Sequence, residues 1–149
     1  MCGPPDKERL AWYEIDPTRF HHETRRLKKP WTFEQGSDGR YSWRGGTVAK
    51  RYKGKSAPPR CAQLIYPYGF PARFIEARLE PNIPRDFWGM LGLHVNADGS
   101  ACYVNGDGWS PQDTVQKALE LFEEWWWNYY WLVEMGVEQT WPSNGLVEV

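Results

Sequence analysis

The spacing of apolar positions in the last third of the chain is helical. Apolar residues recur three or four positions apart between residues 115 and 133, which places them on one face of a helix. They are Val115, Ala118, Leu119, Phe122, Trp126, Tyr129 and Val133. Ser110 and Pro111 form a helix-start signal, and Gly136 is a typical helix stop. The pattern therefore predicts one long helix from Ser110 to Met135.

Four large residues of this predicted helix fall outside its apolar face. They are Leu121, Trp127, Tyr130 and Trp131. Two interpretations are open: the segment Trp141–Val149 covers them, or they form a surface for a partner. The first interpretation is favoured. Under the second, Trp127 and Trp131 are the candidate partner-binding residues, and their exposure distinguishes the two interpretations.

The preceding part of the chain predicts a short helix followed by strands. Asp16-Pro17 is a helix-start signal, and a helix over Thr18–Lys29 would end before Pro30. Glycines and prolines then separate short runs of aromatic and β-branched residues, which is typical of strands. The expected strands are Trp31–Gln35 or Tyr41–Trp43, Thr47–Tyr52, Cys61–Ile65 and Arg73–Leu79. Their short connections favour antiparallel pairing, and residues 81–110 are expected to form a long, irregular loop.

Composition adds the class of protein. A chain of 149 residues fits one domain, and its 10 Trp, 8 Tyr and 6 Phe exclude intrinsic disorder because so much aromatic surface can be buried. No apolar run approaches the roughly 20 residues of a membrane span, and the sequence shows no signal peptide, so a cytoplasmic protein without membrane contact is expected. Three cysteines, an odd number, predict free thiols rather than a disulfide framework.

Charge is distributed unevenly along the chain. Residues 1–60 hold 14 Lys and Arg against 7 Asp and Glu, or +7, whereas residues 61–149 hold 4 against 12, or −8. One interpretation is a basic docking surface; the other is two solvated faces that attract each other within one fold. The net charge of −1 gives no sign of nucleic-acid binding, so no nucleic-acid partner is expected.

The candidate chemistry is concentrated in the irregular region. His94-Val95-Asn96 precedes Asp98-Gly99-Ser100 and Cys102, and Trp109-Ser110-Pro111 follows. Upstream lies Tyr66-Pro67, with Pro71 four residues further on. In this order the motifs resemble the ubiquitin-conjugating enzyme (UBC) family, over roughly residues 16–135. Val95 departs from the family's proline. The H-V-N-x-D-G-S-x-C form looks more like the bacterial UBC-like proteins of CBASS anti-phage operons.

The resemblance implies an α+β fold with an N-terminal helix, a four-stranded antiparallel meander, an active-site loop and a long C-terminal helix. It implies a single UBC-like domain over residues 1–149, with its core at about 16–135 and a tail at 136–149. It further implies that the protein is a transferase whose carried group is a protein C-terminus, of a cyclic-oligonucleotide synthase (CD-NTase) or of a ubiquitin-like protein. An activating enzyme is a further candidate partner, and no cofactor is expected.

Individual roles follow from the resemblance and from chemistry. Cys102 would carry the acyl group as a thioester and pass it to an amine, although a lone cysteine is most often a buried small hydrophobe. Asn96 would donate a hydrogen bond to the oxyanion, and His94 would support the backbone of the turn. Asp98 or Asp107 is a candidate acid on the acceptor side. No metal site is predicted, because the His21-His22 pair lacks further ligands at suitable spacing.

The short N-terminal helix supplies the candidate partner-binding cations Arg19, Arg25 and Arg26. In the family this helix meets the activating enzyme. Two other functions compete with the transferase: a catalytically silent UBC-like scaffold, and a Cys-His hydrolase that uses Cys102 and His94. The scaffold would work without Cys102, and the hydrolase needs the His94 ring within reach of the Cys102 sulfur.

Overall fold

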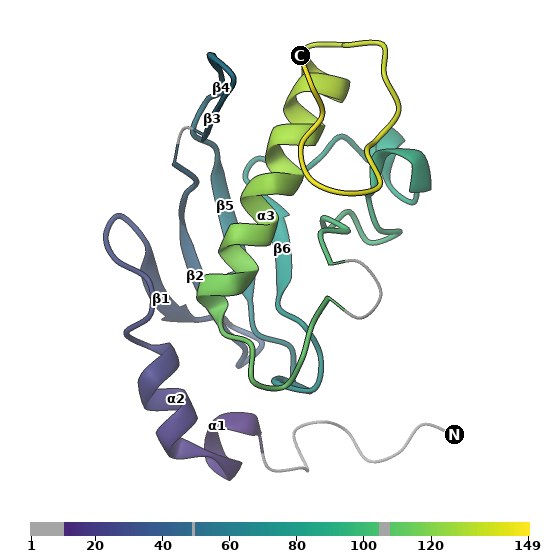
Figure 1. The fold of residues 1–149 in the computed structure, drawn as a ribbon. Helices are drawn as coiled ribbons and strands as arrows, with labels where there is room; N and C mark the ends of the chain where they lie inside the picture. The colour runs from purple at the N-terminus through teal and green to yellow at the C-terminus, as the bar shows by residue number, and fades with distance from the viewer. Residues whose placement is uncertain (1–10, 49, 105–107) are drawn as a thin grey trace.

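The computed structural model describes residues 11–48, 50–104 and 108–149. It is an α+β fold in which one long helix lies across a face of a small antiparallel sheet (Figure 1). Two short helices lie beyond the start of the long helix, and the C-terminal segment loops around its end. Within the described residues, no helix is both long and apolar enough to cross a bilayer.

The main sheet has four antiparallel strands in the order β1-β2-β5-β6. They are β1 (Thr32–Gln35), β2 (Tyr41–Gly46), β5 (Cys61–Ile65) and β6 (Glu76–Leu79). The prediction of an antiparallel meander is confirmed, and both alternatives for its first strand are realised as a paired hairpin. The last strand is shorter than expected, beginning at Glu76 rather than Arg73.

The predicted strand Thr47–Tyr52 is wrong as a member of this sheet. Instead β3 (Lys50–Tyr52) and β4 (Lys55–Ala57) pair with each other as a separate hairpin. Lys53 and Gly54 both have positive φ, 50° and 78°, which closes a tight two-residue turn. This hairpin, which carries Lys50, Arg51, Lys53 and Lys55, therefore projects beyond the sheet rather than extending it (Figure 1).

The predicted N-terminal helix is shorter and broken in two. The structure has α1 (Trp12–Ile15) and α2 (Pro17–Glu23), and Asp16 caps α2 by accepting from the Arg19 backbone N–H. The helix does not reach Lys29, because the Thr24 hydroxyl donates to the His21 carbonyl at 2.8 Å. A side chain that satisfies this carbonyl replaces the next helical backbone bond and favours an end there.

The long helix α3 (Val115–Tyr129) begins five residues later than predicted. Ser110 and Asp113 close a turn instead, in which the Ser110 N–H donates to the Asp113 carboxylate at 2.7 Å. A π-helical turn, η4 (Tyr130–Glu134), extends the helix, and Gly136 with φ of 70° follows it. The predicted stop at Gly136 is confirmed.

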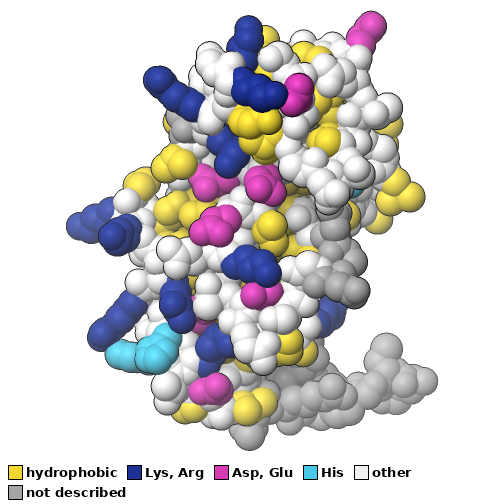
Figure 2. Space-filling view, in the orientation of Figure 1, with side chains coloured by type: hydrophobic (Ala, Val, Ile, Leu, Met, Phe, Trp, Pro, Cys, Tyr) yellow, Lys and Arg dark blue, Asp and Glu magenta, His cyan; other side chains and the backbone are white. Residues whose placement is uncertain are grey.

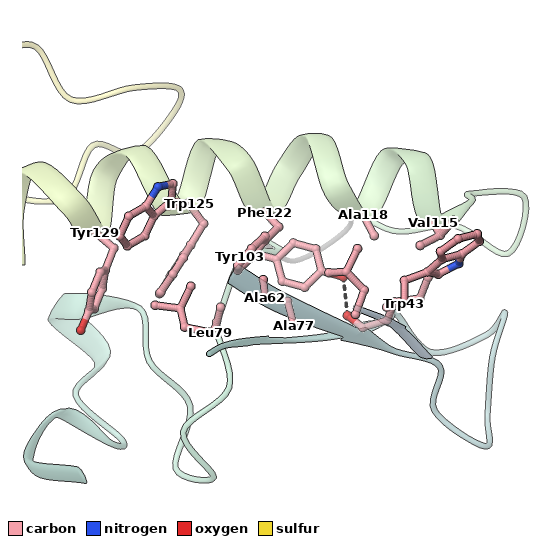
Figure 3. Close-up of a cluster of buried hydrophobic side chains, with 14 of the residues drawn as sticks. Trp43, Ala62, Ala77, Leu79, Tyr103, Val115, Ala118, Phe122, Trp125 and Tyr129 are labelled. Carbon is pink, nitrogen blue, oxygen red and sulfur yellow. Dashed lines mark hydrogen bonds between the residues drawn. The ribbon is translucent and has the colours of Figure 1, made fainter. Parts of the chain in front are cut away.

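The core lies between α3 and the sheet (Figure 3). The helix contributes Val115, Ala118, Phe122, Trp125 and Tyr129, and Figure 3 draws them facing Trp43, Ala62, Ala77, Leu79 and Tyr103. All of these residues are buried. Small alanines on the central strands leave room for aromatic rings of the helix, so the predicted helical face is the one that packs.

The C-terminal tail covers the other face of α3. The indole N–H of Trp127 donates to the Val147 carbonyl at 3.0 Å, and Trp127 is fully buried. Trp131 is half-buried with its ring 5.9 Å from that of Trp127. The alternative that made Trp127 a partner-binding residue is therefore wrong, because the protein's own tail already occupies that surface. Trp131 keeps only part of its ring accessible.

Candidate active site

A tight hairpin carries the predicted site residues. Val95 pairs with Ala101 in an antiparallel bridge, and the Cys102 N–H donates to the His94 carbonyl at 2.9 Å. Both Val95 and Ala101 are buried, and the Ala101 N–H donates to Ala77 of β6 at 2.8 Å. The hairpin is thereby fixed to the edge of the sheet, and it brings His94 and Cys102 together.

The sequence Asp98-Gly99-Ser100 forms the turn of this hairpin. The Asp98 carboxylate accepts from the Ser100 N–H at 2.9 Å and from the Ser100 hydroxyl at 2.6 Å. Gly99 has φ of 86°, and a Cβ there would lie 2.3 Å from the ring of Trp88. Only glycine suits both the positive φ and this close approach.

Cys102 lies on the wall of a small cavity of about 50 Å³. The cavity is lined by the hairpin, by one face of α3 and by the tail, including His94, Glu124, Asn128 and the segment 141–145. Cys102 is half-buried, and this burial raises the pKa of its thiol above the ordinary value of 9.0. The thiol is therefore mostly protonated at neutral pH, which suits acceptance of an already activated acyl group better than unaided attack on an amide.

His94 contacts the backbone of the hairpin, helix α3 and the C-terminal tail. It adopts a left-handed conformation (φ 53°, ψ 47°), and its carbonyl accepts from the Cys102 N–H and from the Trp125 indole, both at 2.9 Å. Its ring stacks on Trp141 with centroids 4.4 Å apart. Burial lowers the pKa of His94, and a hydrogen bond with the Cys102 backbone opposes this effect.

The contacts of His94 disfavour the hydrolase interpretation. Among the described residues, no hydrogen bond joins the His94 ring to the Cys102 sulfur, and the ring is instead stacked on Trp141. A Cys-His hydrolase requires its base to contact the nucleophile directly.

The Asn96 side chain is hydrogen-bonded within the hairpin. Its side-chain nitrogen donates to the Ser100 hydroxyl at 3.0 Å and to the Ala101 carbonyl at 3.3 Å. Asn96 is also absent from the cavity wall that holds Cys102. The predicted oxyanion donor is therefore engaged within the hairpin, where it stabilises the turn.

Of the two candidate acceptor-side acids, Asp98 and Asp107, the structure describes only Asp98. Asp98 lies at the exposed tip of the hairpin, and its carboxylate pairs with Arg78 at 3.2 Å. Partial burial raises its pKa, but the hydrogen bonds from Ser100 and the Arg78 charge outweigh this and hold the pKa below 3.8. Asp98 is thus committed to the turn and lies outside the cavity wall. Asp107 lies outside the described residues.

Arg19, a predicted partner-binding residue, makes its contacts within the fold. Its guanidinium donates to the Pro111 carbonyl at 2.9 Å and to the Asp113 carbonyl, and it lies over the Phe70 ring at 4.8 Å. These contacts tie α2 to the turn before α3. Arg25 and Arg26 are exposed, although Arg26 also pairs with Glu23 at 3.2 Å. Figure 2 shows cationic and histidine side chains together over α2.

Sequence reasoning missed Glu23 and Glu124. The buried Glu23 carboxylate accepts from the Val115 N–H at 3.0 Å and so caps α3, and burial raises its pKa despite that bond and the nearby arginines. Glu124 lines the cavity of Cys102. Helical spacing gives a signal for Glu124, because Leu121 and Asn128 on the same face also line the cavity.

The described ranges contain no group of three or more His, Cys, Asp or Glu side chains arranged to hold a metal ion. No protein-family model, curated protein or solved structure matches this chain.

Proposed function

We propose that this chain is a bacterial UBC-like conjugating enzyme that carries a protein C-terminus on Cys102 as a thioester and transfers it to an amine. The main support for this proposal is the hairpin of residues 94–102. It holds Cys102 between the sheet edge and helix α3, on the wall of a polar cavity. The resemblance in motif order supports the same assignment, because it implies a cysteine placed after an antiparallel meander and before a long helix.

The finer parts of the proposal concern the fold family, the partner and the biological setting. The fold would be the UBC fold, and the carried group would be the C-terminus of a cyclic-oligonucleotide synthase in an anti-phage operon of the CBASS type, with the protein acting in the cytoplasm. This reaction does not require a thiol with a low pKa, since an activated acyl group can be exchanged between sulfurs without a strongly acidic cysteine. The raised pKa of Cys102 is compatible with this exchange.

Thioester formation on Cys102 is the test. The protein is incubated with ATP and with the candidate carrier and activating enzyme encoded by neighbouring genes, and the mixture is run on a non-reducing gel. We expect a thiol-sensitive adduct that Cys102→Ala abolishes. Cys61→Ala is the matched control, because Cys61 is an exposed cysteine on β5. Full transfer activity in Cys102→Ala would contradict the proposal.

A scaffold function is the second candidate, and one observation favours it. The Asn96 amide is hydrogen-bonded within the hairpin, and Asn96 does not line the cavity of Cys102. A silent scaffold would bind its partner and support pathway output equally well with Cys102→Ala. Phage-resistance assays that compare this variant with the wild type therefore separate the two functions.

A further inference from the structure

We propose that the cavity beside Cys102 is the binding site for the acceptor's primary amine, and that Glu124 is the carboxylate that accepts the amine's proton. This inference rests on the proposed function, since it names a site for the second substrate of the same reaction. It moves the acceptor-side role from Asp98, which the hairpin turn and Arg78 engage, to a residue on α3.

The geometry places a thiol and a carboxylate on one cavity. Cys102 comes from the hairpin, whereas Glu124 and Asn128 come from one face of α3, one helical turn apart. Ser143 and Asn144 of the tail add polar groups to the remaining wall. A volume of about 50 Å³ is enough for the ammonium end of a lysine side chain, which is little larger than a water molecule.

Charge also favours an amine. Glu124 is half-buried, and none of the ion pairs formed by the described residues involves it. Cys102 carries the acyl group as an uncharged thioester when the acceptor binds, so it adds no charge to the cavity. A half-buried carboxylate without a counter-charge favours a cationic ligand, since an opposite charge offsets the desolvation of both groups.

The proposed transfer converts one acceptor ammonium ion and the Cys102 thioester into an amide, a free thiol and one proton released to solvent. The acceptor arrives as an ammonium ion and gives one proton to the Glu124 carboxylate. The free amine nitrogen attacks the thioester carbonyl carbon, the new N–C bond forms, and the C–S bond breaks with its electron pair on the Cys102 sulfur. The second proton lost by nitrogen goes to that thiolate, and Glu124 returns its own proton to solvent. The products are the amide and the free thiol.

Discharge of a loaded protein to two different nucleophiles tests the assignment. A short peptide ending in glycine, supplied as its mercaptoethanesulfonate thioester, is exchanged onto Cys102 and checked by intact mass. The loaded protein is then mixed with lysine, whose amine is protonated at neutral pH, or with hydroxylamine, which is largely unprotonated there. Glu124→Gln should slow discharge to lysine by about 100-fold and leave hydroxylamine discharge nearly unchanged.

Glu120→Gln is the matched control, because Glu120 is exposed on the same helix one turn earlier. It should discharge to both nucleophiles at the wild-type rate. Normal loading and hydroxylamine discharge by Glu124→Gln also show that this variant is folded.

Each other outcome has a distinct meaning. If the wild-type protein never loads on Cys102, the proposed function itself fails. If it loads but Glu124→Gln discharges to lysine normally, or discharges to both nucleophiles equally slowly, the amine site is wrong. A selective loss in Asp98→Asn or Asp107→Asn with a normal Glu124→Gln would place the role on those residues and likewise overturn the assignment.

Discussion

The two ends of helix α3 are built in opposite ways. At its start, the Glu23 carboxylate is fully buried and accepts from the Val115 N–H and the Tyr66 hydroxyl, while Arg26 pairs with its other oxygen. Towards its end, Glu124 borders a cavity that also holds the Cys102 thiol. The buried Glu23 carboxylate is enclosed by partners and fixes the fold, whereas the half-buried Glu124 lines a cavity.

The two carboxylates differ in how much of their surroundings can change without disturbing the fold. A saturated buried network is rigid and costly to disturb, because every lost hydrogen bond leaves a polar group without a partner. The cavity end is held by contacts to the tail, namely Asn128 to Gly145 and Val147 and Trp141 to His94. These contacts surround Cys102 without filling its cavity.

Glu23→Ala should have the largest effect on stability. It leaves the Val115 N–H and the Tyr66 hydroxyl without their acceptor and the helix without its cap, so we expect a loss of about 3 kcal/mol in the free energy of unfolding. Urea denaturation followed by circular dichroism measures it. A loss smaller than that of an exposed control such as Glu120→Ala would contradict the role of Glu23.

The pH dependence of the free energy of unfolding provides a second test of Glu23. Burial raises its folded-state pKa above 4.5, so its contribution to stability is present below that pH and is lost as the pH rises through the folded-state pKa. Glu23→Gln does not titrate. The unfolding free energy of the wild type minus that of Glu23→Gln should therefore fall as the pH rises above 4.5, and a constant difference would contradict the raised pKa.

Asn128→Ala tests the other end of the helix. Its amide nitrogen donates to the Gly145 carbonyl at 3.0 Å, and its oxygen accepts from the Val147 N–H at 2.7 Å. We expect a stability loss of about 2 kcal/mol and faster hydrogen exchange in residues 145–149. Unchanged exchange there would mean that Asn128 does not hold the tail, and Asn128→Asp, which keeps the acceptor, should preserve part of the protection.

Alkylation compares Cys102 with Cys61. Because burial raises the pKa of the Cys102 thiol and Cys61 is exposed, iodoacetamide should modify Cys61 about tenfold faster at pH 8. The Cys102 rate should keep rising with pH beyond 9, since the thiolate is the reactive form. Peptide mapping by mass spectrometry separates the sites, and a Cys102 rate that levels off below pH 9 would contradict the effect of burial.

Arg25→Glu should have the smallest effect. Arg25 is exposed on α2, so reversal of its charge should weaken thioester formation a few-fold at low salt and hardly at high salt if a partner binds there. Arg51→Glu on the exposed β3–β4 hairpin is the matched control. A change that does not depend on salt would leave Arg25 as an ordinary solvated residue.

Local pattern was enough for part of the fold. The apolar spacing of Val115, Ala118, Phe122 and Tyr129 correctly identified the packed face of the long helix, and Gly136 correctly marked its stop. Helix starts were less accurate, because Ser110-Pro111 suits a turn as well as a first helical turn. The true start at Val115 depends on Glu23, which is 92 residues away in sequence.

The candidate site also has a part that could be predicted from the sequence and a part that could not. The motif around Cys102 could be found in the sequence because the hairpin is local, and Asp98, Gly99 and Ser100 form its turn by contacts within a few residues. The cavity could not be found in this way, because its walls come from a hairpin, a helix and a tail that only tertiary packing brings together.

The antiparallel pairing of the strands, the packed face of the long helix and its stop at Gly136 could be predicted from the sequence, because they depend on interactions between near neighbours. Only the packing of distant segments covers Trp127, brings Arg19 and Glu23 to the start of α3, and places Glu124 on the cavity that Cys102 also lines. These outcomes depend on which distant segments share the limited buried space beside one helix, and periodicity carries no information about that choice.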